Sequence, residues 1–328
     1  MARLPLAVAL SLTLLAVAAA PAGAIVGGSV AQRDFPHMAA MEFRQDDGRW
    51  TFICGASLVR PDVVLTAAHC VPDDPETTGR EDDPARYRFL IGTRDRERGG
   101  ERIQAVRLVS HPQYDSEAGA YDVAVLKLQR ATTLGTPIRI ASGEDADRFE
   151  PGDEATIIGW GATSSGGGAQ RELREGQVPI VSDSTCGRNY TVTARFDPPT
   201  MICAGNTTGG EDTCQGDSGG PLMVPDAGGR LILVGDVSFG FGCAFPTQFG
   251  VYGEVAGATL KPWVDARLEE LSPRTSSPPR GSGPTAGSPS GGGDSGSAPD
   301  SGSAPDASPD GSGANSPVLV RLPARLGS

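Results

Sequence analysis

The residue types best suited to chemistry lie at positions 216–221, where a serine stands among glycines in the order Gly-Asp-Ser-Gly-Gly-Pro. A serine hydroxyl is a weak nucleophile, so it needs a base, donors for the oxyanion it creates, and a backbone bend that exposes it. Glycines permit that bend because they accept strained dihedral angles. The amides of Gly216 and Ser218 are therefore candidate oxyanion donors. Most glycine-rich turns with Asp and Ser are ordinary loops, so this stretch needs partners elsewhere.

Two further stretches carry side chains that could assist such a serine. His69 ends an apolar run at 65–70, and Asp122 precedes a second apolar run at 123–126. A histidine near its solution pKa can act as a base at neutral pH, and a buried aspartate can fix its tautomer and stabilise the imidazolium ion. Each residue taken alone is more often structural. The order histidine, aspartate, serine in separate β segments predicts a catalytic triad.

The elements that must position these residues are mostly strands. Short β-branched runs alternate with Gly, Pro and Asp, which predicts an all-β sandwich or barrel. One helix is expected at 258–271, where apolar residues recur at helical spacing before a Ser-Pro pair, and a glycine-rich loop is expected at 164–177. Examples of the β-branched runs are 56–59, 63–67, 88–91, 123–128, 155–158, 231–237 and 250–255.

The two ends of the chain differ in composition from its middle. Residues 1–24 combine Arg3, an apolar run and then small residues, which predicts a secretory signal peptide; a cut before residue 21 would leave 21–24 as a short propeptide. The alternative is a signal anchor, for which the apolar run is short. Residues 272–328 are mostly Ser, Pro, Gly, Ala and Asp, which predicts a disordered tail. We therefore expect a secreted, extracellular protein with no stable membrane span.

Charge and cysteine content narrow the class of function. The net charge of −12 argues against nucleic acid as a partner. The tail is neutral, so this acidity belongs to residues 25–271. Six cysteines without a Cys-x-x-Cys pair favour disulfides over a zinc site, and the sequence alone leaves their pairing open.

Six ordered motifs resemble those of trypsin-like serine proteases of the chymotrypsin family. They span nearly the whole stretch from Ile25 to Leu271, and so many motifs in order are specific to that family. The motifs are Ile-Val-Gly-Gly at 25–28, Thr-Ala-Ala-His-Cys at 66–70, Asp-Val-Ala-Val-Leu at 122–126, Gly-Asp-Ser-Gly-Gly-Pro at 216–221, Ser-Phe-Gly at 238–240 and Gly-Val-Tyr at 250–252.

The resemblance implies an all-β protease domain over 25–271. Its fold would be two perpendicular six-stranded antiparallel β-barrels, at about 25–137 and 138–257, with the site between them and a C-terminal helix at about 258–271. The resemblance also implies three disulfides, namely Cys54–Cys70, Cys186–Cys203 and Cys214–Cys243.

Roles follow from the family by position. Ser218 matches the nucleophile, His69 the general acid and base, and Asp122 the carboxylate that orients the histidine. The amides of Gly216 and Ser218 match the oxyanion hole, and Ser238 matches the residue that hydrogen-bonds to the aspartate and offers backbone to the substrate. The implied reaction is peptide hydrolysis through an acyl-enzyme, with no cofactor.

Specificity is expected from the residue six positions before the nucleophile, which is Asp212. A carboxylate at the base of a narrow pocket pairs with a guanidinium or ammonium group, and Gly240 and Gly250 match wall positions that leave the pocket open. We therefore expect protein or peptide substrates cleaved after Arg or Lys, and protein protease inhibitors as further partners of a monomeric enzyme. The alternative alignment puts Glu211 at the base, but Cys214 favours Asp212.

Two positions depart from the family pattern. Phe239 replaces the usual tryptophan beside Ser238, which predicts altered subsite preference. The loop at 93–98, where the family binds calcium, has three arginines and no acid at the first ligand position. Calcium requires a cage of oxygen ligands, so no metal site is expected.

Activation in the family depends on a new N-terminus, which here would be Ile25, inserting beside Asp217. Ala24 precedes it, so a pocket specific for Arg or Lys would not cut there. We expect signal peptidase to free Ile25, or another enzyme to remove residues 21–24. The rival interpretation is an inactive homologue that acts as a binding module, although no member of the triad is missing.

Overall fold

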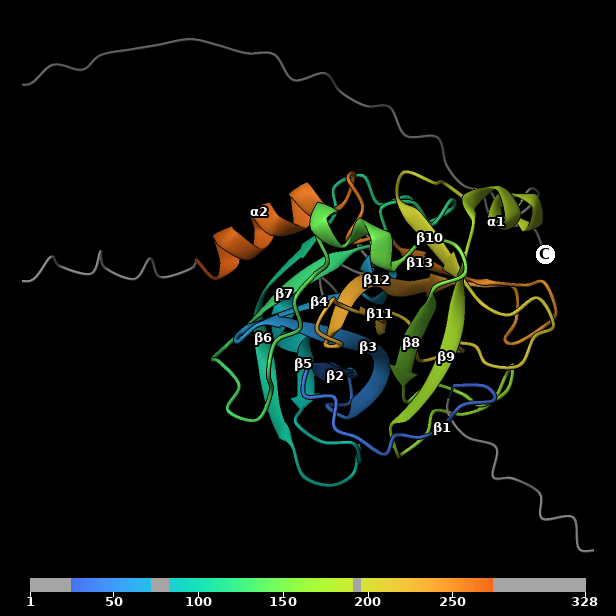
Figure 1. Ribbon diagram of the computed structural model, residues 1–328. Helices are drawn as coiled ribbons and strands as arrows, with labels where there is room; N and C mark the ends of the chain where they lie inside the picture. Colours follow the sequence, from blue (N-terminus) through green and yellow to red (C-terminus); the bar gives the residue numbers. More distant parts are fainter. Residues whose placement is uncertain (1–24, 72–82, 191–195, 274–328) are drawn as a thin grey trace, which may run out of the picture. The chain divides into compact units, whose positions relative to one another are not determined.

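The computed structural model describes residues 25–71, 83–190 and 196–273 (Figure 1). The expected signal peptide and nearly all of the expected tail lie outside these residues. In this part of the chain, no helix is long and apolar enough to cross a bilayer.

The first barrel is closed in the strand order β2-β3-β4-β7-β6-β5, and every pairing is antiparallel. Its core is built from side chains such as Leu58, Phe89 and Leu126, which are fully buried. The strands are β2 (Met38–Arg44), β3 (Trp50–Arg60), β4 (Val63–Thr66), β5 (Tyr87–Ile91), β6 (Glu101–Ser110) and β7 (Ala124–Leu128).

The second barrel has the order β9-β10-β13-β12-β11-β8 and closes where β8 pairs with β9. Burial alternates along β9, as expected for a strand with one face on a core. The short strand β1 (Ser29–Val30) adds to β9. The other strands are β8 (Glu154–Gly159), β9 (Arg174–Val181), β10 (Met201–Ala204), β11 (Pro221–Pro225), β12 (Leu231–Phe239) and β13 (Gly250–Gly253).

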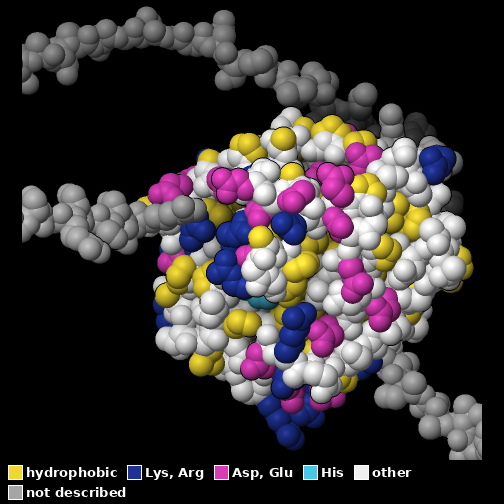
Figure 2. Space-filling view, viewed as in Figure 1, with side chains coloured by type: hydrophobic (Ala, Val, Ile, Leu, Met, Phe, Trp, Pro, Cys, Tyr) yellow, Lys and Arg dark blue, Asp and Glu magenta, His cyan; other side chains and the backbone are white. Residues whose placement is uncertain are grey.

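A single apolar cluster joins the two barrels and the C-terminal helix. It contains Leu65 and Val125 from the first barrel, Met223 from the second, and Val264 and Leu268 from α2 (Lys261–Leu271). The face in Figure 2 shows acidic and basic side chains interspersed around small apolar areas. The shared core fixes the two barrels against each other, so residues from both can form one site.

The observed fold confirms the expected class: two closed six-stranded antiparallel barrels with a C-terminal helix. Some details differ. The helix begins at Lys261, not near residue 258. The loop expected up to residue 177 ends at Leu173, because β9 begins at Arg174. The unpredicted elements include α1 (Asp183–Asn189), capped by Ser182, and the 3-10 helices η1 (Ala68–Cys70), η2 (Pro84–Arg86) and η3 (Gly143–Arg148).

Candidate active site

His69 and Asp122 are brought together by the pairing of β4 with β7. Thr66 lies opposite Ala124, so η1, which follows β4, meets the residues that precede β7. The Asp122 carboxylate accepts the His69 amide at 2.8 Å through Oδ1 and meets the ring Nδ1 at 2.7 Å through Oδ2. This contact holds Nδ1 and leaves Nε2 for proton transfer.

Ser238 of β12 brings the second barrel to the same carboxylate. Its hydroxyl donates to Asp122 Oδ2 at 2.5 Å. Asp122 is 2% exposed, yet its two oxygens have three contacts with potential donors. Both oxygens of this buried carboxylate are thus engaged by neighbours from the two barrels.

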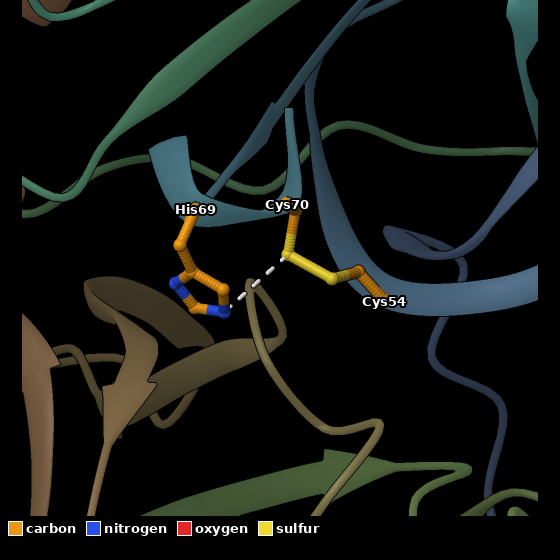
Figure 3. A group of neighbouring side chains, drawn as sticks. All are labelled: Cys54, His69 and Cys70. Carbon is orange, nitrogen blue, oxygen red and sulfur yellow. Dashed lines mark hydrogen bonds between the residues drawn. A yellow bond between two sulfur atoms is a disulfide. The ribbon is translucent and has the colours of Figure 1, made fainter. Parts of the chain in front are cut away.

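The His69 ring lies beside the Cys54–Cys70 disulfide (Figure 3). Nε2 is 3.7 Å from Cys70 Sγ. One nitrogen of His69 and the two cysteine sulfurs, which are atoms of the kinds that bind metals, lie within 4.8 Å of one another. Both sulfurs are bonded to each other, so they offer no thiolate to a metal. The disulfide instead ties η1 to β3.

The serine turn is held by backbone contacts from both barrels. The Gly55 amide of β3 donates to the Ser218 carbonyl at 2.8 Å, and the Gly219 amide donates to Val237 of β12 at 2.8 Å. Gly219 has φ +73°, and a Cβ there would lie 2.0 Å from Thr66 Oγ1, so the turn requires glycine at this position. The turn therefore presses directly against β4, the strand that leads to His69.

Two amides of this turn remain free for a ligand. Among the described residues, the amides of Gly216 and Ser218 donate no hydrogen bond, whereas those of Asp217, Gly219 and Gly220 do. Gly216 has φ +94°, which places its amide in an orientation that other residues rarely adopt. Ser218 Oγ makes no hydrogen bond to His69 within the described chain. Such contacts are often long before substrate binds.

A pocket of about 210 Å³ opens beside Ser218, and Asp212 lines it as predicted. A Cβ at Gly250 would lie 3.2 Å from Asp212 Oδ1, so a side chain there would fill the pocket. The Cys214–Cys243 disulfide joins two of its walls, with 5.4 Å between Cα atoms. Ser238 and Gly240 also line this pocket.

The Asp212 carboxyl is 5% exposed and short of partners. Oδ2 accepts the Ala244 amide at 2.7 Å, while Oδ1 has no hydrogen-bond partner among the described residues. Burial raises the pKa of Asp212 to about 6. A cation entering the pocket would oppose that shift and find an acceptor oxygen ready.

Ile25 is fully buried, and its segment is tied to the pocket. Val26 and Asp212 exchange backbone hydrogen bonds of 2.9 and 3.1 Å, so the segment after Ile25 and the base of the pocket form one β-bridge. Asp217 is fully buried next to this region and accepts the amides of Gly161 at 2.7 Å and Cys214 at 2.9 Å. Burial raises the pKa of Asp217 to about 7, which favours a cationic partner.

The structure also locates the cysteines, the other two histidines and the loop at 93–98. All six cysteines pair as the resemblance implied, including Cys186–Cys203. His37 and His111 are buried in the structure; burial and Arg33 lower the pKa of His37 to about 4. In the 93–98 loop, Asp95 pairs with Arg171, and Arg96 lies over the Phe52 ring.

Two features near the site were not predicted from the sequence. A second pocket, of about 370 Å³, is lined by His69 and Asp122 and shares Phe239 and Gly240 with the first. Phe241 lines this second pocket, and Tyr190 stacks on its ring. The two residues come from distant segments, so no local sequence pattern predicts the contact. Asp236 lies buried two residues before Ser238, and an acid within an apolar strand was a visible signal.

Comparison with known proteins agrees with this geometry. The family model for trypsin matches residues 25–264. A trypsin of Saccharopolyspora erythraea is 37% identical over 250 residues, which cover 76% of this chain and 98% of that protein. A vitellin-degrading protease of Bombyx mori is 33% identical over 249 residues, which cover 75% of this chain and 86% of that protein. The chain is a serine-type endopeptidase and belongs to the trypsin family of serine proteases.

Proposed function

We propose that this protein is a secreted endopeptidase that cleaves after Arg or Lys, with Ser218, His69 and Asp122 as its catalytic triad. The observation that carries the proposal is that Asp212 and Ser218 line the same pocket. A long basic side chain bound by the Asp212 carboxylate would present its own carbonyl to the Ser218 hydroxyl. Charge-assisted hydrogen bonds to a buried acid favour Arg and Lys over neutral side chains.

The mechanism follows from the contacts of the proposed triad. Ser218 Oγ attacks the carbonyl carbon while its proton passes to His69 Nε2, and the amides of Gly216 and Ser218 stabilise the resulting oxyanion. The imidazolium then gives that proton to the leaving amine, and the C–N bond breaks. A water molecule repeats the sequence on the acyl-enzyme: His69 takes its proton, and Ser218 leaves with it. Asp122 holds Nδ1 throughout.

A panel of p-nitroanilide peptides that differ only in the residue before the scissile bond tests the specificity. We expect kcat/KM for Arg and Lys to exceed that for Phe by at least about a hundredfold, the value of a well-formed buried charge pair. Equal turnover of the Phe substrate would overturn the assignment to Asp212. Titration with a fluorophosphonate separates an active enzyme from an inert binding homologue, because only an activated Ser218 reacts.

We further propose that residues 25–271 form the protease domain, released from the predicted signal peptide, with 272–328 as a tail. In the active form the α-amino group of Ile25 would pair with Asp217, the buried carboxyl that favours a cation. The β-bridge between Val26 and Asp212 supports this, because it couples the chain start to the specificity pocket. Edman sequencing of active protein from the culture medium should read Ile-Val-Gly-Gly. Active protein with another N-terminus would contradict the activation proposal.

A further inference from the structure

A second carboxyl group lies behind the proposed triad, on the strand that carries Ser238. Asp236 of β12 is fully buried, and neither of its carboxyl oxygens has a hydrogen-bond partner among the described residues. Buried polar groups normally find partners, and an unpaired buried charge is especially costly. The proposed mechanism uses no property of this side chain, so its presence needs a separate explanation.

The Asp236 carboxyl and the Asp122 carbonyl both border the space next to the Cα of Gly253. Asp236 lies opposite Gly253 of β13, and a Cβ built on Gly253 would lie 2.7 Å from Asp236 Oδ1 and 3.3 Å from the Asp122 carbonyl oxygen. The missing side chain at Gly253 thus leaves space that the two acids share. Ser238, two residues along β12, reaches the Asp122 carboxylate.

The two acids differ in their donors, and this decides which one holds a proton. Asp122 has the His69 amide, His69 Nδ1 and the Ser238 hydroxyl, whereas Asp236 has no donor in the described chain. Burial and the nearby charge of Asp122 raise the pKa of Asp236 well above its ordinary value. When two close carboxyls compete, the group with hydrogen-bond donors ionises and the other stays neutral.

Among the described residues, no cationic side chain forms a hydrogen bond or ion pair with the Asp236 carboxyl. The cross-strand neighbours on β11 and β13 are Pro221 and Gly253, which carry no charge. Glu254, next along β13, is itself an acid, and burial and Asp183 raise its pKa to about 7. Burial and then Asp122 raise the pKa of the Tyr114 phenol on the Asp122 side. His69 and Ser238 contact Asp122 and not Asp236.

We propose that Asp236 is a positioning residue of this site: a buried neutral carboxyl group that donates its proton to the carbonyl oxygen of Asp122 and leaves the negative charge on the Asp122 carboxylate. This proposal rests on the proposed role of Asp122. The neutral acid fixes the Asp122 backbone, so the carboxylate keeps its alignment with His69. Ionisation of Asp236 would remove this donor and add a second negative charge behind the imidazole.

Kinetics of three variants test the positioning role. Asp236→Leu removes the donor and should lower kcat about tenfold with KM within about twofold, the kinetic equivalent of one lost hydrogen bond. Asp236→Asn keeps an N–H donor and should restore kcat to within about twofold of wild type. Val234→Ala, on the same buried strand, is the packing control and should leave kcat unchanged. Equal kcat in Asp236→Leu and wild type would overturn the role, and so would equal losses in the Leu and Asn variants.

The pH profile gives a readout that packing would not move. The alkaline loss of kcat/KM in wild type should include a component from ionisation of Asp236, and Asp236→Asn should lack that component. Any loss that arises from the Ile25 amino group should be common to both proteins. Superimposable alkaline limbs for the two proteins would contradict a proton held by Asp236.

Stability measured without catalysis separates this proposal from the proposed function. In the Ser218→Ala background, an Asp236 that is neutral when folded and ionised when unfolded favours the unfolded chain as pH rises. The measurement compares the unfolding constant of the protein that keeps Asp236 with that of its Asp236→Asn variant. The ratio of the two constants should increase tenfold per pH unit between the unfolded-state pKa of Asp236, about 3.9, and its folded-state pKa. A flat ratio would show an ionised Asp236 and overturn the proposal. A failed fluorophosphonate titration with a rising ratio would instead count against the proposed triad and leave the neutral acid standing.

Discussion

The two barrels contribute to the site in different ways. The first supplies His69 and Asp122, whose mutual contacts are already formed. The second supplies Asp212, Asp217 and Asp236, three buried acids whose pKa values are raised by burial. Overall charge differs in the same sense: residues 25–137 hold 14 basic and 17 acidic residues, whereas residues 138–271 hold 9 and 19.

This difference shows how one fold divides its tasks. The contacts of Asp122 are already in place, with His69 in the first barrel and Ser238 in the second. Among the described residues, Asp212 and Asp217 of the second barrel accept only backbone amides and Asp236 accepts no hydrogen bond, and burial raises the pKa of each. We propose a substrate side chain for Asp212, the Ile25 amino group for Asp217 and a retained proton for Asp236. Binding and activation would thus be assigned to the second barrel.

The largest expected effect comes from disturbing the contact between Asp122 and His69. Asp122→Asn keeps the shape but replaces one acceptor oxygen with a donor, so the His69 tautomer with Nδ1–H is no longer favoured. We expect kcat to fall about 10⁴-fold, the size typical of this change in a serine-protease triad. Steady-state kinetics on an Arg p-nitroanilide would measure it. Retention of more than a tenth of wild-type kcat would show that Asp122 does not orient His69.

A smaller effect is expected from Asp217, which accepts only backbone amides among the described residues. Consider Ser218→Ala protein that keeps Ala24 and so has no free Ile25 amino group. Burial raises the pKa of its Asp217 to about 7 in the folded state, against about 3.9 in the unfolded chain. The contribution of Asp217 to stability is therefore most favourable below pH 4 and falls as pH rises to 7. The loss would be up to about 4 kcal/mol over those three pH units.

The same protein beginning at Ile25 should largely escape this loss, because an ammonium group beside Asp217 favours the ionised form. Asp217→Asn in the Ala24 form is the matched control: it should lack the part of the pH dependence that Asp217 contributes and keep the part that the other buried acids contribute. Urea unfolding between pH 4 and pH 8 measures all three proteins. Parallel curves for the two N-terminal forms would rule out pairing between Ile25 and Asp217.

Much of this division was visible in the sequence. Positions such as His69, Asp122, Ser218 and Asp212 carry side chains whose chemistry is unusual for their local pattern, so motif order located them. The strand β9 was not among the predicted strands, and its first residues, beginning with Arg174, were assigned to the glycine-rich loop expected up to residue 177. In the structure Arg174 is buried and donates to the Gly28 carbonyl at 2.8 Å.

What the sequence could not supply were contacts between distant segments. The stacking of Tyr190 on Phe241 and the approach of Asp236 to Asp122 depend on the register of strands far apart in the chain. A local pattern gives the face on which a side chain lies, but not the residue opposite it. The partners of a buried acid set its pKa, and they depend on the strand pairing of the closed barrels. The three-dimensional structure is therefore needed to identify them.

Asp212 offers the next test of the comparison, with an effect smaller than that of the triad. Asp212→Asn is nearly isosteric and removes the charge, so kcat/KM for an Arg substrate should fall about a hundredfold, equivalent to about 3 kcal/mol for a broken buried charge pair. Turnover of a Phe substrate should stay within about threefold of wild type, because its side chain does not use the charge. Equal losses on both substrates would indicate damage to the serine turn and not to specificity.

The smallest effect is expected where the two barrels meet across the second pocket. Gly119, in the segment between β6 and β7, has φ +71°, and a Cβ there would lie 2.6 Å from the Phe239 ring of β12. Gly119→Ala should displace that ring from the pocket wall that both residues line and raise KM about threefold to tenfold on a tetrapeptide substrate, with kcat within about twofold. Phe239→Ala combined with Gly119→Ala removes the clash, so it separates the steric effect from backbone strain at positive φ. If the double variant keeps the full KM defect of Gly119→Ala and Phe239→Ala alone has none, strain in the first barrel is responsible. If the added Phe239 change abolishes part of the defect, the two barrels bind substrate through this shared wall.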